Sequence, residues 1–85
     1  MHSMSTEAAI KKILDSVLNL GGRAEGFERS TPLLGSVPEL DSMAVVNLLT
    51  SLEEQFGIIV DDDEVSAETF ETLGTLTDFV EAKGG

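Results

Sequence analysis

The stretch Pro38-Glu39-Leu40-Asp41-Ser42-Met43 places a serine hydroxyl at the expected start of a helix. Asp41 is suited to be the N-cap of this helix, because its carboxylate can accept hydrogen bonds from free backbone N–H groups of the first turn. The Ser42 hydroxyl then lies one residue inside the helix and faces solvent. The helix dipole would stabilise a phosphate ester there by about 0.3–1 kcal/mol per negative charge. From spacing alone, the simpler interpretation is that Asp-Ser is only a good helix start.

No other pattern in the chain indicates an enzyme or a metal site. The sequence has no Gly-rich phosphate loop, no zinc-ligand spacing and no cysteine, and no histidine lies near Ser42 to activate its hydroxyl. His2 stands at the terminus, where it cannot be held against a partner. The run Asp61-Asp62-Asp63-Glu64 lacks the ligand offsets of an EF-hand loop, so we expect it to supply caps and first-turn acids of a short helix. The sequence therefore predicts a protein that is not an enzyme and holds no metal.

The charge balance points to basic protein partners. Asp and Glu total 16 against 5 Lys and Arg, and the net charge of -11 disfavours binding to nucleic acid or to anionic membranes. The sequence has no apolar run of about 18 residues that would predict a membrane span. The N-terminus also lacks the segments of a signal peptide. We therefore expect a soluble, cytoplasmic monomer with no membrane insertion.

Two amphipathic helices are expected on either side of the helix that begins at Ser42. The first starts with Ser5 or Thr6 as its N-cap and ends at Gly21-Gly22. Its apolar residues follow helical spacing and are Ile10, Ile13, Leu14, Val17 and Leu18. The last helix is capped by Thr72, is slightly weakened by Gly74 and closes near Lys83. Its core side is expected to consist of Leu73, Leu76, Phe79 and Val80.

The helix from Ser42 to Phe56 is expected to have two different faces. At about 100° per residue, one narrow sector faces the core; it consists of Val45, Leu48, Leu49, Leu52 and Phe56. A second stripe is mildly apolar and then acidic; it consists of Met43, Val46, Thr50, Glu53 and Glu54. One interpretation of this stripe is scatter, since single exposed apolar side chains are normal on a protein surface. The other is a docking face, with Met43 as an adaptable apolar anchor and the glutamates facing a basic partner.

The remaining segments are expected to be loops and one short helix. Glycines and prolines exclude a long helix between Gly22 and Leu40. We expect four apolar side chains to tie this long loop down: Phe27, Leu33, Leu34 and Val37. Ile58-Ile59-Val60 is expected to be extended, and residues 66–70 to form one or two helical turns.

These elements predict an all-α fold, a small four-helix bundle of three main helices plus one short helix. A long loop connects helices 1 and 2. We assign residues 6–83 to this domain and residues 1–5 to a disordered N-terminus. A vector remnant before Met4 would account for the second methionine.

The chain resembles the acyl carrier protein family over nearly its whole length, from Thr6 to Ala82. Leu40-Asp41-Ser42-Met43 is similar to the family's Asp-Ser-Leu attachment motif, with methionine in place of leucine. The surrounding pattern agrees. A first amphipathic helix and a long loop precede the motif, and Leu52-Glu53-Glu54-Gln55-Phe56-Gly57-Ile58 and Phe70-Glu71-Thr72-Leu73 follow it.

The resemblance implies that Ser42 is the attachment point of 4′-phosphopantetheine, transferred from coenzyme A by a magnesium-dependent phosphopantetheinyl transferase. The carrier itself would catalyse nothing. Its arm would hold an acyl group as a thioester and present it to acyl-activating and to acyl-transferring or condensing enzymes with basic docking surfaces. The family's recognition surface implies partner contacts by Met43, Val46, Thr50, Glu53 and Glu54. In the family, apolar residues can also admit the acyl chain into the bundle, and the candidates here are Leu48, Leu52, Val60 and Phe70, although a filled core is the default.

The sequence departs from the family pattern one turn after the serine. Carriers of fatty acid synthesis often have acids just after the serine and again three residues later, where this chain has Ala44 and Asn47. This difference indicates a specialised rather than a housekeeping fatty-acid carrier, working with dedicated acyl-activating or polyketide-type enzymes. One alternative is an aminoacyl or peptidyl carrier, although those more often have glycine where this chain has Leu40. Another is a helical adaptor that never carries pantetheine, in which Ser42 would be dispensable for binding.

Overall fold

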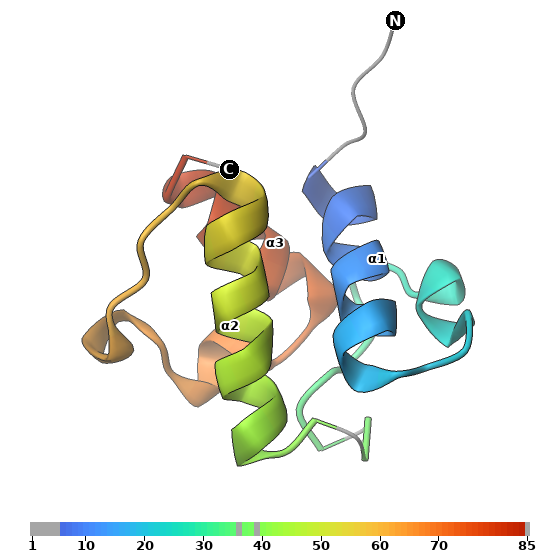
Figure 1. Ribbon diagram of the computed structural model, residues 1–85. Coiled ribbons are helices and arrows are strands. Elements are labelled where there is room, and N and C mark those ends of the chain that lie inside the picture. The colour runs from blue at the N-terminus through green and yellow to red at the C-terminus, as the bar shows by residue number, and fades with distance from the viewer. Residues whose placement is uncertain (1–5, 36, 39, 85) are drawn as a thin grey trace, which may run out of the picture.

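The chain forms three α-helices and three short 3₁₀ helices, as described in a computed structural model for residues 6–35, 37–38 and 40–84 (Figure 1). In chain order the elements are α1 (Thr6–Leu18), η1 (Arg23–Gly26), α2 (Ser42–Phe56), η2 (Asp62–Glu64), η3 (Ala67–Phe70) and α3 (Leu73–Ala82). No strand occurs in these ranges, and a single antiparallel bridge joins Pro32 to Thr72. The all-α prediction is confirmed, but the expected short helix is one 3₁₀ turn. Residues 1–5, to which we assigned a disordered terminus and the Ser5 cap, lie outside the described residues.

Helix α1 ends earlier than predicted. Its last residue is Leu18, and Asn19 adopts a left-handed conformation with φ of 57°. The backbone N–H of Leu20 then donates to the carbonyl oxygen of Asp15 at 3.0 Å, which is the bond pattern of a helix C-terminus closed by a left-handed residue. Asparagine tolerates this conformation better than most residues, so the helix stops before Gly21-Gly22 rather than at them.

The loop between α1 and α2 is held by backbone hydrogen bonds to the end of η3 and the start of α3. The N–H groups of Leu33 and Leu34 donate to the carbonyl oxygens of Glu71 and Phe70 at 3.0 and 2.9 Å. The N–H of Leu73 donates back to Thr31 at 3.1 Å. Of the side chains expected to tie the loop, Leu33 and Val37 are buried and Phe27 is half-buried, but Leu34 is 44% exposed. The expectation for Leu34 was wrong, because its backbone rather than its side chain makes the attachment.

Gly74 has a packing role that its helix propensity does not reveal. Its N–H donates to the carbonyl oxygen of Arg29 at 2.8 Å, and a Cβ at this position would lie 2.9 Å from that same oxygen. Any side chain would therefore push the loop away from α3. We expected Gly74 only to weaken the last helix, and the structure shows that it admits the loop.

Helix α2 is the central element that carries Ser42, with α1 beside it and α3 behind it in the view of Figure 1. Leu48 and Leu52 are fully buried, and Val45, Leu49 and Phe56 pack against the core as partly buried residues. α3 begins at the predicted cap: the Thr72 side chain accepts from the N–H of Thr75 at 3.1 Å. The rest of the core comes mainly from α1, α3 and the loop, with Ile10, Leu14, Leu33, Leu73, Leu76 and Val80 fully buried. None of the helices in the described ranges is long and apolar enough to cross a membrane.

Candidate functional site

Ser42 is the first residue of α2, and Asp41 is its N-cap as predicted. The backbone of Asp41 is extended, and its Oδ1 accepts a hydrogen bond from the N–H of Ala44 at 2.8 Å. The carbonyl oxygen of Asp41 also accepts from the N–H of Val45 at 2.9 Å, which starts the helical ladder. The side chain and the carbonyl oxygen of Asp41 therefore both hold the first turn, and Ser42 is exposed next to this cap.

The environment of Ser42 suits a hydroxyl that is modified by another protein. The N–H groups of Ser42 and Met43 occupy the first two helical positions, where no partner exists within the helix, and they have no acceptor among the described residues. No acid lies in the first turn of α2, so Asp41 is the nearest carboxylate in sequence to an ester on Ser42. The free N–H groups and the helix dipole favour a phosphodiester at this position. The residues present therefore fit a phosphate-linked group on Ser42.

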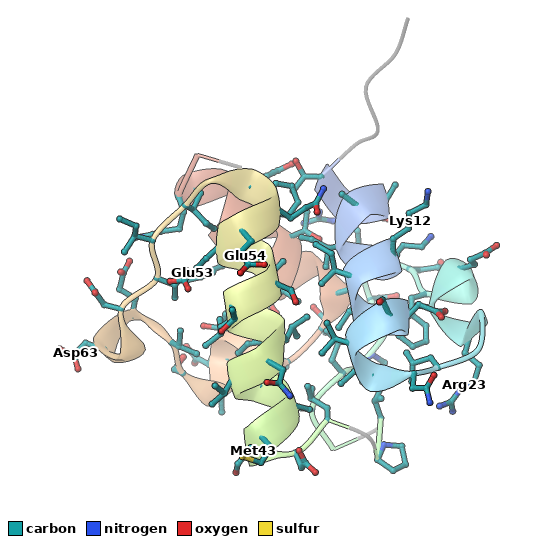
Figure 2. The ribbon with its side chains drawn as sticks, viewed as in Figure 1. Lys12, Arg23, Met43, Glu53, Glu54 and Asp63 are labelled. Atoms are coloured by element: carbon teal, nitrogen blue, oxygen red, sulfur yellow. The ribbon has the colours of Figure 1, made fainter. Side chains whose placement is uncertain are left out.

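The residues of the predicted docking stripe lie along the outer side of α2, with one difference among them. Met43 is 70% exposed and Val46 58% exposed, and Thr50 and Glu54 are also exposed. Figure 2 shows Met43 at the N-terminal end of the helix and Glu54 near its C-terminal end. The stripe thus runs from an apolar part beside Ser42 to an acidic part about three turns further along.

Glu53 differs from the other stripe residues because its carboxylate is used within the protein. Its Oε2 accepts a hydrogen bond from the backbone N–H of Val60 at 2.8 Å, in a half-buried position. Its carbonyl oxygen also accepts from the N–H groups of Gly57 and Ile58. Glu53 therefore sets the direction in which the chain leaves α2. Helical spacing placed Glu53 on the correct side of α2, but it could not reveal a bond to a residue beyond the helix end.

Ile59 is an exposed apolar residue that the sequence analysis did not single out. It is 77% exposed, whereas Ile58 is 7% exposed and Val60 is partly buried. The segment has no regular secondary structure, and the burial of its three side chains alternates, as in an extended chain, where neighbouring side chains point to opposite sides. This alternation within a three-residue apolar run was the sequence signal that could have identified Ile59 as exposed. The Glu53 bond to Val60 fixes the segment directly after Ile59.

The acidic run after this segment forms its own turn. It folds as η2, in which the Glu64 carboxylate accepts from the N–H of Asp61 at 3.1 Å and pairs with the ammonium group of Lys83. The hydrogen bond from Lys83, and after it the bond from the backbone of Asp61, lower the pKa of the Glu64 carboxyl below its ordinary value. Among the described residues, no group of three or more His, Cys, Asp or Glu side chains is arranged to hold a metal ion.

The four candidates for contact with an acyl chain are part of the packed interior. Leu48 and Leu52 are fully buried and Phe70 is 3% exposed, while Val60 is partly buried. They come from α2, from η3 and from the segment after α2. A ligand in contact with all four would have to displace or rearrange side chains, because interiors are close-packed.

Comparison with known proteins connects this site to one family. The family described as phosphopantetheine attachment site matches residues 8–80. The acyl carrier protein of Desulforapulum autotrophicum is 35% identical over 82 residues, which covers 94% of this chain and 99% of that protein. The solution NMR structure of a holo acyl carrier protein from Nitrosomonas europaea is similar with a TM-score of 0.87 and 59% sequence identity, covering 94% of this chain and 96% of that one.

Proposed function

The chain belongs to the acyl carrier protein family, and from this we propose that Ser42 is the residue that carries its prosthetic group. The protein is an acyl carrier with a covalently attached phosphopantetheine, not a catalyst. The thiol at the end of that group holds acyl chains as thioesters, which the carrier presents to other enzymes. The absence of cysteine from the sequence agrees with a working thiol supplied by the prosthetic group.

One observation supports Ser42 above all: its hydroxyl is exposed at the first position of a helix whose cap is fully formed. Asp41 holds the first turn through its side chain and its carbonyl oxygen, so the position of the hydroxyl does not depend on a bound partner. The first N–H groups of α2 have no acceptor among the described residues and favour the negative charge of a phosphodiester. An arm attached at this exposed end can reach solvent and partner enzymes.

The test is intact-protein mass after incubation with coenzyme A, magnesium and a broad-specificity phosphopantetheinyl transferase. We expect the wild-type chain to gain one phosphopantetheine and Ser42→Ala to gain none. Ser30→Ala is the matched control, since Ser30 is also exposed but lies in the loop, and it should be modified as the wild type is. Unmodified wild-type protein, or modification that survives Ser42→Ala, would refute the assignment.

The partners we propose are a phosphopantetheinyl transferase and acyl-activating, acyl-transferring or condensing enzymes with basic docking surfaces. Met43 and Val46 offer exposed apolar contacts beside Ser42, and Thr50 and Glu54 continue the surface along α2. We include Glu53 as a contributor through the segment that it positions. Met43→Ala should weaken transfer by a cognate enzyme without unfolding the domain, because the side chain is 70% exposed. Unchanged transfer kinetics would count against this surface.

We further propose that the pathway is a specialised one, of fatty acid or polyketide type, in the cytoplasm. The support is the lack of acids in the first two turns of α2, where Ala44 and Asn47 stand instead. An enzyme that relies on ion pairs next to the serine would bind this carrier weakly. Introducing Ala44→Asp and Asn47→Glu together should improve acylation by a housekeeping fatty-acid enzyme and lower it with the cognate enzyme. If the double variant leaves the relative rates of acylation by these two enzymes unchanged, the proposed specialisation is refuted.

A further inference from the structure

A groove of about 360 Å³ lies between α1 and α2. Its floor includes Ile13 and Val17 of α1, which are only partly buried although they pack against the core. Short side chains, Ser16 of α1 and Ser51 of α2, stand where longer ones would fill the space between the two helices. The result is a depression of mixed polar and apolar character that the protein's own side chains do not close.

Opposite charges line the two walls of this groove. Lys12 lies on the α1 wall and Glu54 on the α2 wall, and Figure 2 shows each on its helix. Neither side chain makes an ion pair or a side-chain hydrogen bond with another described residue, although Arg29 and Lys83 do so with Asp78 and Glu64. The groove therefore presents a positive wall, an apolar floor and a negative wall.

We propose that this groove binds one amphipathic helix of a partner protein. The α1 wall runs from Ala9 to Val17, about 12 Å at the rise of a helix, which is a little over two turns. A helix laid along the groove would place apolar side chains spaced three, four or seven residues apart over Ile13 and Val17. An acid on one side of that apolar row would face Lys12, and a base on the other side would face Glu54. The charge order fixes the orientation of the bound helix as well as its composition.

The groove is turned away from the site of modification. Ser51 follows Ser42 by nine residues, which at about 100° per residue is about half a turn around α2 and about 13 Å along it. A helix in the groove would leave the Ser42 hydroxyl and Met43 accessible. If Ser42 carries the arm as proposed above, a partner bound here could hold the carrier while another enzyme uses the arm.

Titration of the ¹⁵N-labelled protein with two synthetic helical peptides tests the groove. Both peptides carry leucines at positions i and i+4 and equal numbers of glutamates and lysines; the first has all its glutamates on one side of the leucine row and all its lysines on the other, and the second has both charges mixed on each side. We expect the first peptide to shift the amide signals of Ile13, Ser16 and Ser51 and to bind about fivefold more tightly at low salt, since exposed ion pairs are individually weak. A helix with segregated charges can bind in either direction, so the informative variant is Lys12→Glu, which makes both walls negative and should remove this preference.

The control is Lys11→Glu, which makes the same change of charge at a residue that does not line the groove, although it lines a neighbouring hollow together with Lys12. This variant should keep the wild-type preference. Equal affinity for both peptides, shifts confined to Met43 and Val46, or a preference that the groove variant leaves unchanged would each overturn the proposal. Glu54 belongs both to the groove and to the docking surface along α2, but Ser42 does not line the groove. Saturating peptide should therefore leave the rate of Ser42 modification within about twofold, and a larger loss would contradict the expected access to Ser42. The titration does not use Ser42, so its outcome is independent of the attachment test.

Discussion

Replacement of Glu53 should separate two roles of this residue: a hydrogen bond that stabilises the fold, and a contribution to the recognition of partner enzymes. The Glu53 carboxylate accepts a hydrogen bond from the half-buried N–H of Val60 at 2.8 Å. A bond to a charged acceptor contributes about 1.5–3 kcal/mol, and a buried N–H left without an acceptor costs about 1–3 kcal/mol. Since this pair is only half-buried, water can partly replace the acceptor, and we expect Glu53→Ala to lower the free energy of unfolding by about 1–2 kcal/mol.

Thermal unfolding followed by circular dichroism measures this loss, which corresponds to about 4–15 °C in Tm for a domain of this size. Glu53→Gln keeps an acceptor oxygen without the charge and should lose less than half as much. Glu54→Ala is the matched control, because Glu54 is exposed and its side chain makes no hydrogen bond or ion pair with a described residue. Its effect on the free energy of unfolding should stay within about 0.5 kcal/mol. Hydrogen exchange of the Val60 amide should accelerate in Glu53→Ala and not in the control.

The same variants decide how Glu53 acts on partners. If it works by positioning the segment that carries Ile59, transfer by a cognate enzyme should survive Glu53→Gln better than Glu53→Ala, and Glu53→Lys should fail for both structural and electrostatic reasons. If Glu53→Ala proves as stable as Glu54→Ala, with unchanged exchange at Val60, the hydrogen bond contributes nothing and the reasoning is refuted.

Three further predictions concern the packing and capping of the domain. Gly74→Ala places a Cβ 2.9 Å from the carbonyl oxygen of Arg29, so we expect the free energy of unfolding, measured in urea, to fall by about 1–3 kcal/mol. Unchanged stability would show that the loop can move aside without cost. Asp41→Ala removes the cap of α2, so it should lower the free energy of unfolding by about 1 kcal/mol and slow modification of Ser42. Asp41→Asn should retain most of the stability and most of the modification rate. Equal behaviour of the two variants would contradict a capping role. The pKa of Glu64 is lowered in the folded protein, so its pairing with Lys83 stabilises the fold above the ordinary value of 4.5 and is lost as pH falls below it. Lys83→Met should flatten the pH dependence of Tm in that acid range, and an unchanged profile would refute the coupling.

The elements with strong local signals were predictable from the sequence. Helix α2 has a capping residue, a continuous apolar face and a terminal glycine, so its bounds and the exposure of Ser42 followed directly. Helix α1 was predicted too long, because the asparagine at position 19 is a weaker stop signal than the glycine pair that follows it. Local propensity decides the start and end of a helix only where no neighbouring residue offers a competing stop.

What the sequence could not supply were contacts between segments far apart in the chain. The close approach of Gly74 to Arg29 depends on how the loop crosses α3, and helical spacing contains no information about that crossing. The bond from Val60 to Glu53 likewise requires the chain to fold back after Gly57. The same limit applies to the groove, since Lys12 and Glu54 lie on different helices and their relation is tertiary.

The charge distribution along α2 has a consequence for how a partner approaches Ser42. The first turn has no acid, and Met43 and Val46 near Ser42 are apolar and exposed. The acids begin at the far end with Glu53 and Glu54 and continue at Asp61 and Asp63. Charge acts over about 10 Å at ordinary salt, whereas apolar contact acts only on touching. We therefore expect salt to lower the association rate of a cognate enzyme and to leave its dissociation rate nearly unchanged, while Met43→Ala raises the dissociation rate. Stopped-flow measurements at two salt concentrations distinguish these effects, and a salt effect confined to dissociation would show that the charges bind rather than steer.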